Sequence, residues 1–196
     1  MIILPKTYRQ TNAKSCGPSC LLMAINYLDA GRIKLTEVQE KQLHKEIGHK
    51  NLQMYTMPGS MCEYLLKMGF EVNYFFYDNP VEHDTLIDAC FGEDQKIRNK
   101  IAANPAFHFH FGNFAPDVIK SELIQDRPGF VPINVGTESK PLLHWLLLLN
   151  YVDNPNVPIY ILADPWDGRI KAYVQDDLSN QMYLTGRVFI SAWKPV

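Results

Sequence analysis

The chain has 196 residues, of which 46% are hydrophobic and 20% are charged, and its formal net charge is −2 at pH 7. This length and composition predict a single domain over residues 1–196 with an apolar core, and they argue against extensive disorder. No stretch combines clustered lysine and arginine with aromatic residues. We therefore expect no binding of nucleic acid.

We also expect no segment that spans a membrane. The longest apolar run, residues 142–149, is interrupted by His144 and is much shorter than the ~20 residues of a spanning helix. Residues 1–5 lack the basic start and the long apolar stretch of a secretory signal. Cytoplasmic residence is the default expectation, with export by a signal-independent secretion system as the alternative.

The N-terminal part of the sequence predicts two helices. Apolar residues recur at helical spacing after Cys16, and this first helix is expected to end near Gly31. The second helix is predicted to begin at Thr36, where Gln39 stands three residues later as in a capping box, and to end at Gly48.

A third helix and a first strand follow. We expect Ser60 to cap a helix that stops at Gly69, and the aromatic run 70–77 predicts a strand. Residues 78–116 are the least regular part, with three X-Pro pairs and a mixed helical pattern over residues 86–101. We predict a helical insertion over about 78–116.

The remainder predicts one helix and then mostly β structure. The helix follows Pro116 and ends before the turn at residues 126–129. The predicted strands are residues 130–135, 144–152, 158–163, 169–174 and 188–192. This order of elements predicts an α+β fold in which N-terminal helices pack on a C-terminal antiparallel sheet.

We expect no metal or other cofactor. The four cysteines have irregular spacing, which favours reduced thiols over disulfides or a zinc site: Cys16, Cys20, Cys62 and Cys90. Cys20 is expected to be a small buried residue against the sheet. His108 and His110 share one face of a short predicted strand, but no third ligand stands at a motif spacing.

Cys16 has the sequence context of a nucleophile. It stands at the predicted start of a helix, directly before Gly17 and Pro18. Unpaired backbone N–H groups and the positive end of the helix dipole favour a thiolate at such a position, and a nearby imidazolium would add a full positive charge.

Four segments in chain order give the sequence a resemblance to the C39-like peptidases, a branch of the papain-like cysteine hydrolases. They are Gln10 six residues before Cys16, the Cys-Gly-Pro start of the apolar helix, residues 141–149 around His144, and residues 160–168 around Asp164. The resemblance extends over most of the chain. It implies a papain-like fold.

The resemblance also implies a role for each of these residues. Cys16 would attack the substrate, and His144 would take its proton and later give it to the leaving amine. Asp164 would accept a hydrogen bond from the far imidazole nitrogen. Gln10 would stabilise the oxyanion together with the backbone N–H of Cys16.

Three neighbouring residues are expected to contact the substrate, namely Gly17, Trp145 and Trp166. A methionine group with one tyrosine either lines a substrate cleft or fills the core: Met54, Tyr55, Met57, Met61 and Met68. The expected partner is a peptide or protein substrate. The oligomeric state stays open.

The leading hypothesis is a stand-alone cysteine peptidase or amidase that works through an acyl-enzyme. The best-known C39 peptidases belong to ABC exporters and cut leader peptides after paired glycines, whereas this sequence has neither membrane spans nor an ATP-binding motif, so specificity stays open. A glutamine deamidase or transglutaminase-like acyl transferase could use the same triad. A catalytically silent module that binds peptides is the third hypothesis.

Overall fold

The computed structural model describes residues 6–50, 54–77, 85–112, 115–137, 142–183 and 188–195, without the side chains of residues 85–91 and 183. Its helices are α1 (Cys16–Leu28), α2 (Glu37–Ile47), α3 (Pro58–Lys67), α4 (Thr85–Ile101), α5 (Pro116–Ile124) and α6 (Gln175–Tyr183). Its strands are β1 (Gly48–His49), β2 (Tyr55–Thr56), β3 (Glu71–Tyr77), β4 (Phe107–Gly112), β5 (Gly129–Asn134), β6 (Leu143–Val152), β7 (Ile159–Asp164), β8 (Arg169–Val174) and β9 (Val188–Trp193).

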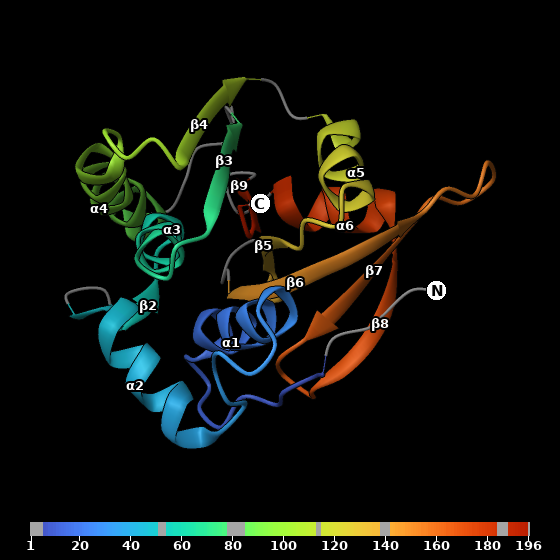
Figure 1. The fold of residues 1–196 in the computed structure, drawn as a ribbon. Helices are drawn as coiled ribbons and strands as arrows, with labels where there is room; N and C mark the ends of the chain where they lie inside the picture. Colours follow the sequence, from blue (N-terminus) through green and yellow to red (C-terminus); the bar gives the residue numbers. More distant parts are fainter. Residues whose placement is uncertain are drawn as a thin grey trace.

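Seven strands form one sheet in the order β4-β3-β9-β5-β6-β7-β8 (Figure 1). Neighbouring strands of this sheet are antiparallel except β3 and β4, which are parallel. Parallel neighbours need a crossover connection, and α4 lies between them in the chain. The fold is therefore α+β with a mostly antiparallel sheet, which confirms the predicted class.

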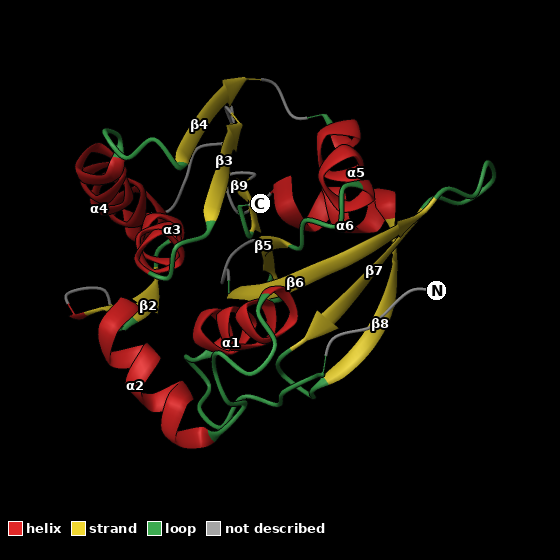
Figure 2. Cartoon of the chain, viewed as in Figure 1, coloured by secondary structure: helices red, strands yellow, loops and turns green. Residues whose placement is uncertain are grey.

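Helices cover both faces of the sheet (Figure 2). On one face α1 is packed against β6, and the cluster of apolar side chains around it extends to α2 and α3. On the other face α5 and α6 pack against β5 and β6 over a second apolar cluster. Residues 16–25 of α1 are all buried, so α1 is the central helix of the domain and its start is enclosed by protein.

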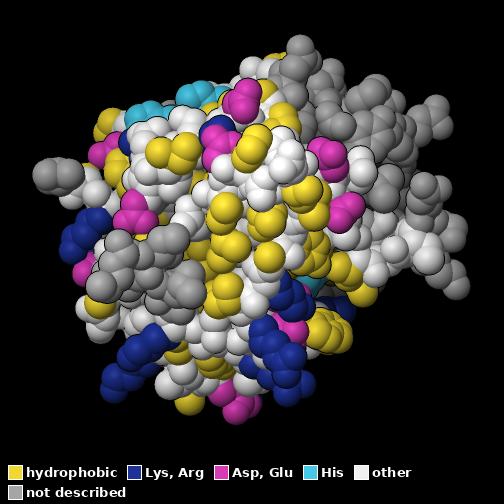
Figure 3. All heavy atoms as spheres, turned by 90° about the vertical axis from the view of Figure 1, so that its right-hand side faces the viewer, with side chains coloured by type: hydrophobic (Ala, Val, Ile, Leu, Met, Phe, Trp, Pro, Cys, Tyr) yellow, Lys and Arg dark blue, Asp and Glu magenta, His cyan; other side chains and the backbone are white. Residues whose placement is uncertain are grey.

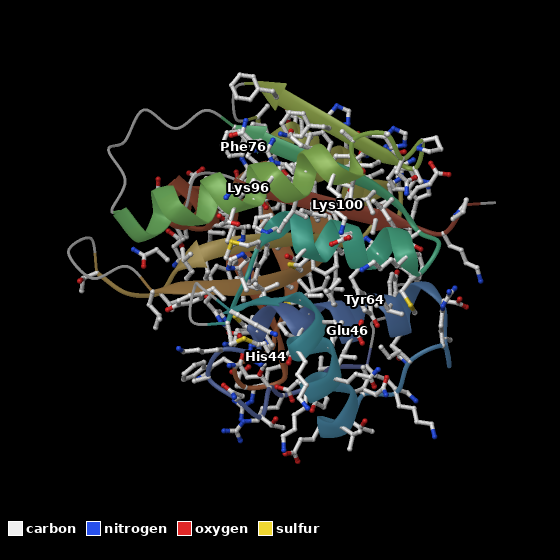
Figure 4. The ribbon with its side chains drawn as sticks, turned by 90° about the vertical axis from the view of Figure 1, so that its left-hand side faces the viewer. His44, Glu46, Tyr64, Phe76, Lys96 and Lys100 are labelled. Carbon is white, nitrogen blue, oxygen red and sulfur yellow. The ribbon has the colours of Figure 1, made fainter. Side chains whose placement is uncertain are left out.

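The outer surface differs between the two sides of the molecule. On one side the labelled Tyr64 of α3 lies beside Glu46 of α2, and Lys100 of α4 pairs with Glu63 of α3 at 2.6 Å (Figure 4). On the opposite side apolar side chains are exposed in the middle of the face (Figure 3). No helix in the described part of the chain has the length and apolar character needed to cross a membrane.

Most predicted elements are confirmed, and the start of α3 is corrected. The Thr36 side chain accepts a hydrogen bond from the N–H of Gln39, as expected for the cap of α2. However, α3 begins at Pro58 and not after Ser60. Proline suits the first helical position, and the missing local cap is replaced by Asp94, which accepts the N–H of Gly59 at 2.6 Å.

The described part of the predicted insertion is not purely helical. It contains α4 and then β4, which extends the sheet beyond β3. Residues 78–84 and 113–114 and the side chain of Cys90 lie outside the described residues. That the segment is an insertion stays a prediction.

Candidate active site

Cys16, His144 and Asp164 come together at the start of α1. Cys16 is the first residue of α1, His144 is the second residue of β6, and Asp164 is the last residue of β7. Because β6 and β7 are antiparallel neighbours, the start of one lies beside the end of the other. Nε2 of His144 lies 2.8 Å from Oδ1 of Asp164, so Nδ1 is left for the thiol. The imidazole also has a side-chain hydrogen bond with Cys16.

The surroundings of His144 favour its charged form. Burial alone would lower its pKa, but the hydrogen bonds with Asp164 and Cys16 outweigh burial and raise the pKa to about 9. For Asp164, burial raises the pKa, and hydrogen bonds from His144, Lys171 and the backbone N–H of Trp166 more than reverse this, so its pKa lies well below the usual range. Imidazolium and carboxylate therefore stabilise each other.

Lys171 of β8 is a site residue that the sequence reasoning missed. Its Nζ donates to Oδ2 of Asp164 at 2.5 Å and lies 3.0 Å from Oδ2 of Asp167. The N–H of Trp166 donates to Oδ1 of Asp164 at 2.9 Å. Both carboxylate oxygens are thus held in place, and the orientation of the imidazole follows from them. Lys171 stands seven positions after Asp164 in the sequence. Only the pairing of β7 with β8 could have indicated that these two side chains meet.

Gln10 lies beside the turn that follows β7. Its backbone N–H donates to the carbonyl oxygen of Pro165 at 2.7 Å. Its Nε2 donates one hydrogen bond to the carbonyl oxygen of Asn12 at 2.9 Å, which leaves a second N–H for another acceptor. The backbone N–H of Cys16 belongs to the first turn of α1, where N–H groups have no acceptor within the helix. Two donors of the kind that an oxyanion needs therefore come from this segment.

Glu40 of α2 holds the same segment, although no sequence motif marks this residue. The carboxylate is 1% exposed and accepts hydrogen bonds from Tyr8 Oη (2.7 Å), Thr11 N (2.9 Å), Thr11 Oγ1 (2.8 Å) and Ser15 Oγ. These donors stand on both sides of Gln10 in the chain, and Ser15 directly precedes Cys16. One buried side chain thus fixes the path of residues 8–15.

A cavity of about 200 Å³ opens beside Cys16. Trp145 and Trp166 line it, as do Tyr55 and Met57, so these two members of the methionine and tyrosine group lie at a cavity. By contrast, Met61 is fully buried in the core. The predicted cleft is therefore formed by only part of that group.

The three predicted contact residues occupy different positions. Gly17 packs against Thr56, since a Cβ would lie 2.7 Å from that side chain, so the structure gives a packing reason for glycine. The indole N–H of Trp145 donates to the carbonyl oxygen of Thr56 at 3.2 Å. Trp166 is 57% exposed, and its ring stands edge-on to that of His144 with 6.2 Å between centroids.

The other described cysteines differ from Cys16. All three cysteines with described side chains are free thiols: Cys16, Cys20 and Cys62. Burial raises the pKa of Cys20 and of Cys62 well above the ordinary value, and the thiol of Cys20 donates to the carbonyl oxygen of Trp145 at 3.4 Å. Cys20 is thus a buried residue against the sheet, as predicted.

The histidine pair of β4 has aromatic neighbours. His108 stacks on Trp193, and His110 stacks on Phe75 with 4.5 Å between ring centroids. Within the described ranges, no group of three or more His, Cys, Asp or Glu residues is arranged to hold a metal ion.

The pairing of His144 with Asp164 predicts a measurable titration. In an NMR titration of the imidazole, we expect a pKa near 9 for His144 in the parent protein. Asp164→Asn removes the negative partner while keeping the side-chain size, so the pKa should fall by about one unit or more. The matched control is Asp167→Asn, which removes a carboxylate that contacts Lys171 and should leave the pKa near its parent value. The same pKa of His144 in the parent and in both variants would contradict the pairing.

Comparisons with known proteins place the chain in a family. No curated protein sequence matches it significantly. The model of the Peptidase_C39 like family matches residues 5–188, a range that includes Gln10, Cys16, His144 and Asp164. The chain therefore belongs to the Peptidase_C39 like family.

Proposed function

We propose that this protein is a cysteine peptidase or amidase that cleaves a peptide or amide bond through an acyl-enzyme on Cys16. The observation that carries the proposal is the hydrogen-bonded series from the Cys16 thiol through His144 to Asp164, at the mouth of a cavity. A nucleophile, a base and a group that orients the base are the parts that covalent catalysis requires. Membership in a family of C39-like peptidases agrees with it.

The proposed reaction begins when the sulfur of Cys16 attacks the carbonyl carbon of the substrate. The carbonyl oxygen becomes an oxyanion, and Nε2 of Gln10 and the backbone N–H of Cys16 donate hydrogen bonds to it. His144, protonated at Nδ1, then gives its proton to the leaving nitrogen as the C–N bond breaks. In the second half, His144 takes a proton from water, the hydroxide attacks the thioester, and the acid product leaves with Cys16 restored.

Selective alkylation tests the nucleophile. We expect iodoacetamide to label Cys16 faster than Cys20 and Cys62, because those two thiols are fully buried and burial raises their pKa. Peptide mapping by mass spectrometry measures the rate for each cysteine in the native protein. Equal rates for the three, or faster labelling of Cys62, would contradict the proposal.

A panel of peptides and proteins separates the reactions that this triad could perform. Cleavage by the parent protein, lost in Cys16→Ala and kept in the matched variant Cys20→Ala, supports the peptidase. The mass gain of deamidation without cleavage, or incorporation of an added amine, would assign the site to a deamidase or transferase instead. Binding of a peptide that survives in Cys16→Ala, with no turnover by the parent, would identify a binding module.

A further inference from the structure

The cavity beside Cys16 is mostly apolar. Fourteen described residues line it, among them Cys16, Met57, Pro58, Leu142, Trp145 and Trp166. Ten of these fourteen are aliphatic, aromatic or proline residues. Pockets of this composition bind apolar groups, with a few polar atoms that set orientation.

The size of the cavity sets the size of the group that fits. A cavity of about 150 Å³ lined by apolar side chains is large enough to bind benzene. The cavity beside Cys16 has about 200 Å³. A phenyl ring or a branched aliphatic side chain therefore fits, whereas glycine would leave the space unfilled.

Two charged residues are among the described residues of the lining, and they differ in burial. Lys14 is exposed, with its ammonium group 5.8 Å from the ring centroid of Tyr55. Asp94 of α4 is 1% exposed, and its carboxylate accepts hydrogen bonds from the N–H of Gly59 (2.6 Å), Tyr74 Oη (2.7 Å) and Arg98 Nε (2.9 Å). Water screens the lysine, whereas the buried carboxylate is neutralised by its ion pair with the guanidinium of Arg98.

This lining disfavours an acidic substrate group. A carboxylate entering the cavity would lose its hydration, which is costly unless donors in the wall replace the water. The donors around Asp94 already have an acceptor, so they offer little compensation. The transfer of an uncharged apolar group from water into the cavity is favourable.

We propose that this cavity binds an uncharged apolar side chain of the substrate, of the size of leucine, methionine or phenylalanine, on the acyl side of the bond that is cleaved. The proposal rests on the proposed function, because it takes Cys16 as the nucleophile. Asp94 forms part of the wall and also caps α3, whose N-cap residue Met57 and first residue Pro58 line the cavity. Through Asp94, α4 thus contributes to the shape of the cavity.

Peptidyl chloromethyl ketones test the proposal, because docking of the peptide part accelerates their alkylation of a nucleophilic cysteine. Two series of reagents vary one residue among Phe, Leu, Gly and Glu. In the first series this residue is next to the reactive carbon, and in the second it is one residue further away. In one of the two series we expect the reagents with Phe or Leu to inactivate the protein about tenfold or more faster than the reagent with Gly. The reagent with Glu should be the slowest. Mass spectrometry of Cys16 measures the rates, each divided by the rate for iodoacetamide.

Leu142→Arg tests the cavity directly. Leu142 is 47% exposed, and its backbone N–H is held by Oδ1 of Asn134, so the variant should fold. A positive charge at the rim should slow the Phe reagent and accelerate the Glu reagent, changing their ratio by about tenfold. Val152→Arg, at the other end of β6 and 43% exposed, is the matched control that leaves the ratio unchanged.

The outcomes separate this proposal from the function on which it rests. Rapid labelling of Cys16 by iodoacetamide with equal rates for Phe, Gly and Glu reagents would overturn the cavity proposal alone. Slow labelling by every reagent would contradict the proposed nucleophile itself. An unchanged ratio in Leu142→Arg would also overturn the cavity proposal.

Discussion

Replacing His144 with alanine should lower kcat/KM for cleavage of an amide bond by about four orders of magnitude or more. His144 contacts both Cys16 and Asp164, so in the proposed mechanism its removal takes away the base that activates the thiol and the acid that protonates the leaving nitrogen. The same variant should lose the selective labelling of Cys16 by iodoacetamide at neutral pH. Steady-state kinetics and peptide mapping measure the two effects.

His110→Ala is the matched control for this experiment. His110 is also a histidine of the large sheet, but it stacks on Phe75, and its Nε2 donates a hydrogen bond to Oδ1 of Asn73 on β3. We expect His110→Ala to keep kcat/KM within a few-fold of the parent. Comparable losses in both variants would mean that a disturbed sheet, and not a missing acid and base, explains the result of His144→Ala.

The three residues of the proposed triad could be placed from sequence because strong local patterns surround each of them. The apolar run around His144 and the short apolar run that ends at Asp164 both predict strands, and a turn cluster at residues 153–156 joins them. A short turn makes the two strands antiparallel neighbours, so the start of the first lies beside the end of the second. The structure has this pairing in β6 and β7.

The polar residues that support the site could not be placed in the same way. Glu40 stands in a polar helix, where a charged residue ordinarily faces water, and its partners Tyr8 and Thr11 are about thirty residues earlier in the chain. Asp94 accepts from Gly59 across 35 residues of sequence. These contacts depend on how α2 and α4 pack, and no local spacing encodes the packing of two helices.

The place of β4 in the sheet and the helix α6 could not be predicted, for physical reasons. In β4 the alternation of Phe and His indicates a strand, but only its parallel pairing with β3 fixes its place at the edge of the sheet. In α6 the sequence is polar apart from Leu178 and Met182, which are one turn apart and fully buried. A single apolar pair does not identify a helix without the sheet on which it packs.

Replacing Glu40 with alanine should lower the free energy of unfolding by about 3 kcal/mol, because hydrogen-bond donors from Tyr8, Thr11 and Ser15 lose a buried acceptor. Urea unfolding at pH 7 measures this loss. The matched control is Glu37→Ala in the same helix, whose side chain is 55% exposed and pairs with Lys41, so stability should change little.

Glu40→Gln keeps the shape of the side chain and tests the charge. Burial would raise the pKa of Glu40, but hydrogen bonds from Ser15, Tyr8 and Thr11 outweigh it, so the pKa lies below the ordinary value. A carboxylate with a lowered pKa adds stability that is complete at neutral pH and is lost as the pH falls below about 4.3.

The stability difference between the parent and Glu40→Gln should therefore be largest near pH 7 and should shrink on acidification. Because the same hydrogen bonds fix the path of Gln10, we expect kcat of Glu40→Ala to fall by roughly tenfold to a hundredfold, with a smaller change in KM. A difference in stability that grows as the pH falls, or a normal kcat in Glu40→Ala, would show that residues 8–15 reach their positions without Glu40.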